Sequence, residues 1–230
     1  MIRLLAGIAA LLGLLAATPA QLDSQFVLQR YELEMSDLTP PKASIFNYSV
    51  SQLGPANIDQ LHRVYRSGDM VRDETLAVGG IGVTHKVVHI GPRADRYAIE
   101  RLAPRTGTYA LVFLRTVKHG SHLDYEYEAT PLSGSPAFSV ERVTIDGERY
   151  LPSSIRFHTQ SGTAHGTGEL HYAGFGKYWM PVTASINASV NGKPARERIN
   201  WFGYSFPESL PASTFASPKP LPTATLLPQF

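Results

Sequence analysis

Three histidines and a glutamate lie within one short stretch of the chain, and their side chains are of the types that bind metal ions. They are His158, His165, Glu169 and His171, and a zinc site needs three or four imidazole or carboxylate ligands. His165 and His171 are six residues apart on one predicted strand, which places them roughly 20 Å apart at about 3.3 Å per residue. They cannot share an ion, so the sequence predicts no metal site here and favours a solvated sheet face.

A second candidate is a strand on which every other residue is acidic, with Asp124, Glu126 and Glu128 in turn. A catalytic carboxylate pair needs one member kept protonated by a buried environment. The predicted hairpin instead sets Arg115 opposite Glu126, which indicates surface ion pairs. No nucleophile-elbow, zinc-protease or phosphate-loop motif occurs. The sequence therefore predicts no catalytic residue, no metal and no cofactor, and a protein that is not an enzyme.

The composition excludes several other classes of function. The 230 residues are 43% hydrophobic and 17% charged, which suits one globular domain with a sizeable core. A net charge of +2 is too small for a nucleic-acid interface. The chain has no cysteine, so it has no disulfide, no thiolate ligand and no site for lipid attachment at cysteine.

The first twenty residues have the layout of a secretory signal peptide. Arg3 precedes an apolar run from Leu4 to Ala17, and the small residues up to Ala20 suit a cleavage site. The run is shorter than the ~20 apolar residues of a membrane span, which favours cleavage over retention as an anchor. We expect an exported protein, periplasmic or extracellular, that is not an integral membrane protein after cleavage.

One helix and a long series of strands follow. An apolar stripe at helical spacing predicts a helix over about residues 23–37, which Pro40 and Pro41 end. Residues 42–206 consist of short runs rich in Val, Ile, Thr, Tyr and Phe, broken by Gly and Pro, which predicts antiparallel strands. Residues 207–230 are rich in proline and carry little charge, which predicts an extended or disordered tail.

The predicted hairpins separate apolar from polar side chains. Turns of two residues are expected at Gly120-Ser121, Gly162-Thr163 and Asn191-Gly192. These registers set Leu114 opposite Tyr127 and Ile155 opposite Leu170. One face of each hairpin is then apolar, and the histidines of the first stretch all fall on the polar face. A slip of one residue would reverse the faces, so their separation supports the registers.

A sheet with one apolar face must cover it, either with a second sheet or by curving around another element. We therefore predict a mainly β protein. Its core is a single antiparallel meander of about nine to eleven strands, curved into an unclosed half-barrel around the N-terminal helix, with a β-sandwich as the alternative. The residues expected on the concave, ligand-binding face are Leu114, Tyr125, Tyr127, Ile155, Phe157, Leu170, Tyr172, Ile199 and Trp201.

Three motifs along the strands read "YRSGDMVRDE", "DGERYLPSSIRF" and "GKYWMPVTASI". Together with the order of elements, they resemble the bacterial LolA-like superfamily, which includes lipoprotein carriers and RseB-type periplasmic sensors. The early Gly, Arg and acidic residue of that family are matched by Gly68, Arg72 and Glu74, and its Leu-Pro by Leu151-Pro152. The resemblance implies that residues 21–206 form an unclosed barrel whose apolar concave side accepts acyl chains. The lidding helices of the carriers are not evident, so it does not imply lipoprotein transfer specifically.

The leading interpretation is an exported, non-enzymatic protein that binds a lipid, an acyl chain or a lipoprotein on its concave face. The charged residues Arg72 and Glu74 are expected to form a salt-bridged rim or to grip a ligand headgroup. The alternative is a secreted β-sheet interaction or scaffold module whose concave face is a core filled by the helix. The volume and lining of the concave cavity discriminate between these two functions.

Overall fold

The computed structural model describes residues 22–37, 42–55, 57–84, 87–91, 103–134, 138–159 and 161–217. The predicted signal peptide, residues 1–20, and the last part of the predicted tail, residues 218–230, lie outside these ranges. Within the described ranges, no helix combines the length and the apolar sequence that crossing a bilayer requires.

The described residues form one α-helix, twelve strands and a short 3-10 helix. The helices are α1 (Ser24–Asp37) and η2 (Ala212–Phe215). The strands are β1 (Ala43–Leu53), β2 (Ile58–Ser67), β3 (Met70–Val78), β4 (Ile81–Gly82), β5 (Val88–Gly91), β6 (Tyr109–His119), β7 (His122–Pro131), β8 (Phe138–Ile145), β9 (Pro152–Thr159), β10 (Ala164–Phe175), β11 (Tyr178–Val190) and β12 (Lys193–Ser205).

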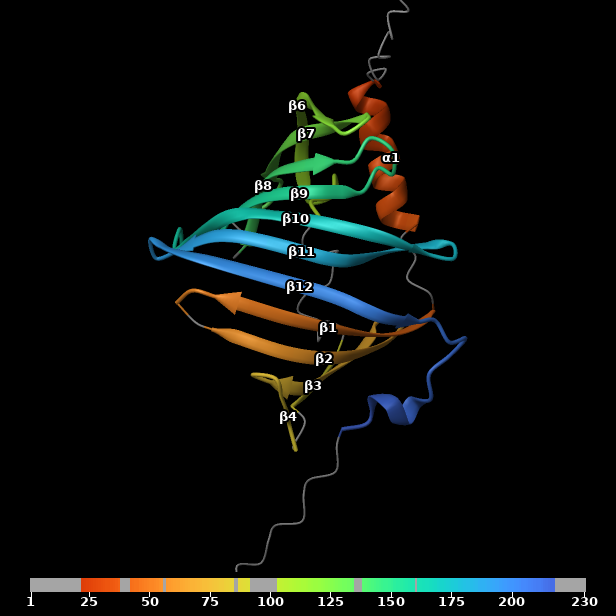
Figure 1. Ribbon diagram of the computed structural model, residues 1–230. Helices are drawn as coiled ribbons and strands as arrows, with labels where there is room; N and C mark the ends of the chain where they lie inside the picture. Colours follow the sequence, from red (N-terminus) through yellow and green to blue (C-terminus); the bar gives the residue numbers. More distant parts are fainter. Residues whose placement is uncertain are drawn as a thin grey trace, which may run out of the picture.

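All twelve strands belong to a single sheet in the order β4-β3-β2-β1-β12-β11-β10-β9-β8-β7-β6, with β5 also paired to β3. Along this order successive strands of the chain are neighbours, except where β1 lies beside β12. The sheet is curved and its two ends do not pair with each other (Figure 1). The prediction of a curved, unclosed antiparallel sheet is confirmed, and the β-sandwich alternative is wrong. Two short strands, β4 and β5, bring the number to twelve.

Helix α1 packs against the apolar face on the β6–β9 side of the sheet. Val27, Tyr31 and Met35 are spaced four residues apart and form one buried stripe of the helix. This stripe packs into an apolar cluster that includes Tyr125 and Tyr127 of β7. In Figure 1 the helix stands beside the ends of β8, β9 and β10. The helix thus fills one end of the concave face.

Tyrosine hydroxyl groups also fix α1 to the rest of the protein. The Tyr31 hydroxyl donates to the carbonyl of Pro104 at 2.7 Å, and the Tyr127 hydroxyl donates to the carbonyl of Ser24 at 2.5 Å. Burial raises the pKa of both phenols above the ordinary value. Both groups are therefore protonated donors at neutral pH.

The hairpin of β11 and β12 has the predicted turn and register. Asn191 and Gly192 both have a positive φ, 51° and 76°, as a two-residue type I′ turn requires. Ala184 of β11 then lies opposite Ile199 of β12. The prediction for this hairpin is confirmed.

The hairpin of β6 and β7 departs from the predicted register at a β-bulge. Arg115 lies opposite Glu126, as predicted. The bulge then sets Phe113 opposite Tyr127, the place predicted for Leu114. An extra residue on one strand reverses the faces of the residues beyond it. Phe113 accordingly packs against the ring of Tyr127, whereas Leu114 is 40% exposed, so the predicted pairing of Leu114 is wrong.

The hairpin of β9 and β10 is shifted by two residues from the prediction. β9 ends at Thr159 and β10 begins at Ala164, so the connection is longer than the predicted two-residue turn. Ile155 consequently lies opposite Gly168 instead of Leu170. The predicted register is wrong, but a shift of two residues leaves every side chain on its predicted face because side chains alternate along a strand.

Candidate functional site

The concave face gathers most of the predicted ligand-binding residues into two apolar clusters. The first apolar cluster, which α1 covers, contains four of them: Tyr125, Tyr127, Ile155 and Phe157. The second apolar cluster contains three: Leu170, Ile199 and Trp201. Tyr172 packs against both clusters. Leu114 belongs to neither, because the bulge in β6 turns it away from the concave face.

The two apolar clusters differ in the secondary-structure elements that supply their residues. The first includes Val27, Tyr31 and Met35 of α1. The buried members of the second all come from strands: Phe46, Tyr48, Val50, Val64, Val71, Leu170, Ala184, Ile199 and Trp201. The one α-helix of the described ranges therefore contributes to the lining of only one half of the concave face.

A buried polar triad lies within the second apolar cluster, on three neighbouring strands. The carboxylate of Asp73 accepts a hydrogen bond from the Tyr48 hydroxyl at 2.6 Å and lies 2.8 Å from Nδ1 of His62. The imidazole of His62 stacks on the Tyr48 ring, with centroids 4.5 Å apart, and its Nε2 lies 3.1 Å from Oε1 of Gln60. These contacts satisfy a carboxylate that is only 2% exposed. Sequence reasoning missed the triad, because it depends on the pairing of β1, β2 and β3.

A small apolar cavity lies between the two apolar clusters. Its volume is about 40 Å³, which is close to the ~30 Å³ that one water molecule occupies in the liquid. It is lined by Phe138, Ile155, Phe157, Gly168, Glu169, Leu170, Ala184 and Ile186. A cavity of this size accepts a methyl or methylene group and is too small for an acyl chain.

Gly168→Ala is expected to raise the free energy of unfolding by about 0.5–1 kcal/mol, because alanine restricts the unfolded chain and fills part of the cavity. A Cβ atom at Gly168 would contact only side-chain atoms of Ile155 and Ile186, 3.4 to 3.9 Å away. Gly166→Ala is the matched control on the same strand. Its Cβ atom would clash with the carbonyl oxygen of Asn187, so we expect destabilisation. Urea denaturation measures both variants, and effects of the same sign would contradict this packing.

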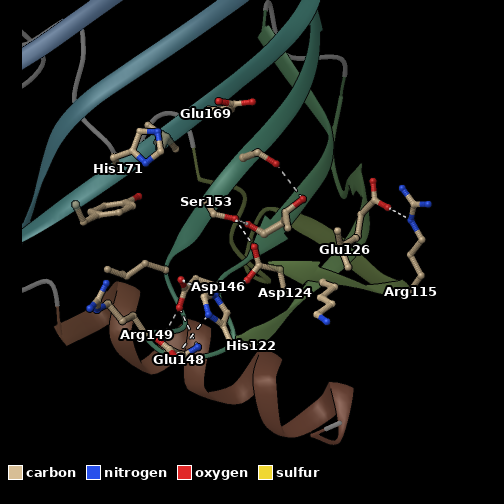
Figure 2. A pocket seen from close by; sticks show the side chains of 17 residues that line it. Arg115, His122, Asp124, Glu126, Asp146, Glu148, Arg149, Ser153, Glu169 and His171 are labelled. Atoms are coloured by element: carbon tan, nitrogen blue, oxygen red, sulfur yellow. Dashed lines mark hydrogen bonds and ion pairs between the residues drawn. The ribbon is translucent and has the colours of Figure 1, made fainter. Parts of the chain in front are cut away.

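A larger, polar pocket of about 630 Å³ lies over β6–β10, on the side of the sheet where polar residues alternate with the concave apolar ones (Figure 2). The ladder between β9 and β10 ends at Ser154 and Glu169, and both residues line the pocket. The other lining residues are Arg115, Val117, Lys118, His122, Asp124, Glu126, Thr144, Asp146, Glu148, Arg149, Leu151, Ser153, Leu170, His171 and Tyr172. The pocket suits a polar or charged ligand.

Glu126 is buried in the wall of the polar pocket between two arginines. Its carboxylate lies 2.5 Å from Nε of Arg115 and 3.4 Å from Nη1 of Arg142. Burial by itself would raise the pKa of Glu126, but the hydrogen bonds and charges of Arg115 and Arg142 outweigh it and hold the pKa below the ordinary value. The predicted pairing of Arg115 with Glu126 is confirmed, although this carboxylate is buried and not at the open surface.

The stabilisation that Glu126 provides is expected to depend on pH. Because the folded-state pKa is lowered, the ion pairs stabilise the protein above the unfolded-state pKa of about 4.3, and this contribution is lost as the pH falls through the folded-state pKa. The stability difference between the wild type and Glu126→Gln should therefore shrink from about pH 6 to about pH 3. Glu128→Gln, at an exposed position of the same strand, is the control. Denaturant midpoints at each pH measure the difference, and a difference that stays constant would contradict the assignment.

His122, Asp124 and Asp146 come together at one end of the polar pocket, and we call them the imidazole–carboxylate cluster. Nε2 of His122 lies 3.1 Å from Oδ1 of Asp124 and 3.5 Å from Oδ2 of Asp146. One ligand atom of each residue lies within 4.8 Å of the other two. Sequence reasoning missed this cluster because Asp146 follows β8 and reaches Asp124 only through the register that pairs Tyr125 with Ile145. A prediction of the register between β7 and β8 would have placed Asp146 beside Asp124 and so revealed the cluster.

The histidines of the stretch from Phe157 to Tyr172 do not form such a cluster. His158 lies directly opposite His165 in the ladder of β9 and β10, and its Nδ1 is 2.9 Å from Oε1 of Glu141. Within the described ranges, neither residue belongs to a group of three side chains whose ligand atoms are close enough to bind one metal ion.

Arg72 and Glu74 form an ion pair on β3, with Nε of Arg72 2.7 Å from Oε1 of Glu74. Nη1 of Arg72 also donates to the carbonyl oxygens of Thr214 and Ala216, at 3.0 and 2.9 Å. The described part of the C-terminal segment is thereby attached to β3. A role of Arg72 and Glu74 toward a ligand headgroup stays a prediction.

Comparisons with known proteins bear on the fold. No protein-family model and no curated protein matches the chain. A LolA superfamily protein from Nitrosomonas europaea is 13% identical, with a TM-score of 0.54 over 86% of this chain and 99% of that one. A domain described as an outer membrane lipoprotein-sorting protein, from Vibrio parahaemolyticus, is 14% identical, with a TM-score of 0.58 over 84% and 97%. A DUF1329 family protein from Desulfovibrio piger is 10% identical, with a TM-score of 0.56 over 84% and 96%.

The chain therefore has the unclosed half-barrel fold of LolA superfamily proteins. The predicted resemblance is confirmed at the level of the fold. At 10 to 14% identity, these similarities do not extend to ligand or partner.

Proposed function

We propose that this protein is exported, catalyses no reaction, and binds a lipid, an acyl chain or a lipoprotein on the concave face of its half-barrel. The observation that carries the proposal is the second apolar cluster, whose buried members all belong to the sheet. Each methylene group buried against such a lining contributes about 0.8 kcal/mol to binding. Leu170, Ile199 and Trp201 would provide the principal contacts with an apolar chain.

Two further observations support this function. One of the similar structures is described as an outer membrane lipoprotein-sorting protein domain, and a lipoprotein carries acyl chains that need an apolar site in water. Residues 1–20 have the layout of a signal peptide. A periplasmic or extracellular location would bring the protein to such ligands.

The small volume of the apolar cavity favours a second candidate function, that of a β-sheet interaction module with no small-molecule ligand. A cavity of about 40 Å³ has no room for an acyl chain unless the two apolar clusters that line it move apart. Helix α1 is held by the hydroxyl groups of Tyr31 and Tyr127, so movement at that end would break these bonds. In the first function the cavity widens for its ligand, and in the second it stays small.

Binding of a fluorescent fatty acid to two matched variants distinguishes the two functions. Ala184 is 1% exposed and lines the apolar cavity, whereas Ser185 is the next residue of the strand and points to the opposite face. For a lipid-binding protein, Ala184→Leu should lower the affinity by about tenfold or more, and Ser185→Leu should leave it unchanged. Equal affinities for both variants would place the ligand elsewhere, and no uptake by the wild type would support the interaction module.

A further inference from the structure

We propose that the imidazole–carboxylate cluster binds a divalent transition-metal cation, with Zn²⁺ as the best match to its donors. Nε2 of His122, Oδ1 of Asp124 and Oδ2 of Asp146 are the three ligands. This inference is independent of lipid binding, because the cluster lies in the polar pocket and not on the concave face.

Two separations between donor atoms are within about 0.2 Å of those of ligands that share one metal ion, and all three atoms lie within 4.8 Å of one another. Two atoms about 2.0–2.2 Å from one tetrahedral Zn²⁺ lie roughly 3.3–3.6 Å apart. Nε2 of His122 lies 3.1 Å from Oδ1 of Asp124 and 3.5 Å from Oδ2 of Asp146. One imidazole with two carboxylates is a donor set that zinc accepts, and it leaves a fourth position open.

The second polar atom of each ligand is held by a neighbouring group, which aims the first atom at the common point. Oδ1 of Asp146 accepts the backbone N–H groups of Glu148 and Arg149, at 2.9 and 2.7 Å. Oδ2 of Asp124 accepts the hydroxyl of Ser153 at 3.4 Å. Supporting contacts of this kind orient the ligands of metal sites.

The imidazole of His122 is oriented in the same way. Its Nδ1 lies 3.6 Å from Oε1 of Glu148. With a metal ion on Nε2, the proton of the imidazole would lie on Nδ1, where the carboxylate of Glu148 is near enough to support it. Figure 2 shows His122, Asp146 and Glu148 converging in this arrangement, above α1.

The local charge also favours a cation. Asp124, Asp146 and Glu148 place three carboxylates around one imidazole, and Asp124 is 4% exposed. The nearby guanidinium of Arg149 lies over the ring of Trp179, 4.0 Å from its centroid. A divalent cation bound among these carboxylates would offset much of their negative charge.

The polar pocket is an independent reason to expect a ligand at this point. The pocket has a volume of about 630 Å³, and the three ligands are part of its lining. The open coordination position would therefore face water or an anionic oxygen of a bound molecule. His171 and Glu169 lie across the pocket from the cluster in Figure 2. Catalytic or exchangeable zinc sites keep an open position in this manner, whereas purely structural sites close it.

Zinc binding by the mature protein, stripped of metal with a chelator and free of any histidine tag, tests the proposal. We expect one Zn²⁺ per chain by isothermal titration calorimetry, and a tetrahedral absorption spectrum when Co²⁺ replaces it. His122→Ala and Asp146→Asn should each lower the affinity by more than about 100-fold, which exceeds the loss expected when only a supporting group is removed. Asp146→Asn retains the oxygen that accepts the backbone N–H groups, so its fold should be preserved.

His158→Ala is the matched control, because His158 also lies beside a carboxylate, that of Glu141, but outside the cluster. Its zinc affinity should equal that of the wild type. No stoichiometric binding by the wild type would overturn the proposal and leave the cluster as a set of contacts within the protein alone. Binding that survives both His122→Ala and Asp146→Asn would overturn it as well.

Discussion

Asp73→Ala should lower the free energy of unfolding by about 3–5 kcal/mol, because it leaves two buried polar groups without their hydrogen-bond partner. The carboxylate of Asp73 is 2% exposed and contacts the Tyr48 hydroxyl and Nδ1 of His62, at 2.6 and 2.8 Å. Alanine removes this acceptor from two groups that are themselves buried. The midpoint of urea denaturation measures the loss, with an unchanged slope indicating that the unfolded state is the same.

Tyr48→Phe removes only one of these bonds and should cost about 1–2 kcal/mol. Asp59→Ala is the control, because Asp59 is exposed on the neighbouring strand β2, and its effect should stay within about 0.5 kcal/mol. A loss below about 1 kcal/mol for Asp73→Ala would mean that the triad does not hold β1, β2 and β3 together.

Tyr31→Ala should have a comparable effect, with a loss of about 3–5 kcal/mol, as for other large aromatic side chains removed from a core. The ring of Tyr31 is fully buried in the first apolar cluster, and its hydroxyl donates to the carbonyl of Pro104 at 2.7 Å. Both contributions hold α1 in the concave face. Thermal unfolding measures the loss, and binding of a hydrophobic dye reports whether the apolar cluster becomes exposed.

Two other variants separate packing from hydrogen bonding at α1. Tyr31→Phe keeps the ring and loses the hydroxyl, so it should cost about 1 kcal/mol. Leu33→Ala is the control on the same helix, because Leu33 is 47% exposed, and it should be close to neutral. If Tyr31→Ala were no more destabilising than Leu33→Ala, α1 would not be a part of the core.

The elements that the sequence predicts well are those set by local rules. The helix expected over residues 23–37 is α1 (Ser24–Asp37), because its apolar stripe and the prolines after it act locally. The Asn191-Gly192 register is correct because both residues adopt the positive φ that a two-residue turn needs. The alternation of apolar and polar residues predicted the faces of β9 and β10 even where the register was wrong.

The departures come from features that carry no local signal. At the turn after β9, the N–H of Gly162 donates to the carbonyl of Thr159 and the N–H of Ala164 donates to the Thr159 hydroxyl, at 2.8 and 3.0 Å. Hydrogen bonds to Thr159 therefore close a loop that is longer than the predicted two-residue turn. The bulge that turns Leu114 outward is an insertion into the ladder, which alternation alone does not reveal. The pairing of β1 with β12 joins the first and last long strands of the chain in the middle of the sheet, and local sequence does not reveal a contact over such a separation.

The candidate site residues also divide into those that local sequence predicts and those that it does not. The concave apolar residues were predictable from alternation, and all but Leu114 lie in the two apolar clusters or pack against them. The triad of Tyr48, His62 and Asp73 and the imidazole–carboxylate cluster were not. Their members lie on different strands, and each group forms only through the registers of β1–β3 or of β7 with β8.

Binding of an apolar chain to the concave face is tested most directly by native mass spectrometry of the mature protein, purified without detergent from cells that export it. We expect a bound amphiphile that organic extraction removes, followed by saturable uptake of one fluorescent fatty acid per chain by the extracted protein. The second apolar cluster, whose buried members among the described residues lie on strands, is where that ligand should lie. A protein that carries no amphiphile and takes up no fatty acid would contradict this function and leave the half-barrel as a filled interaction module.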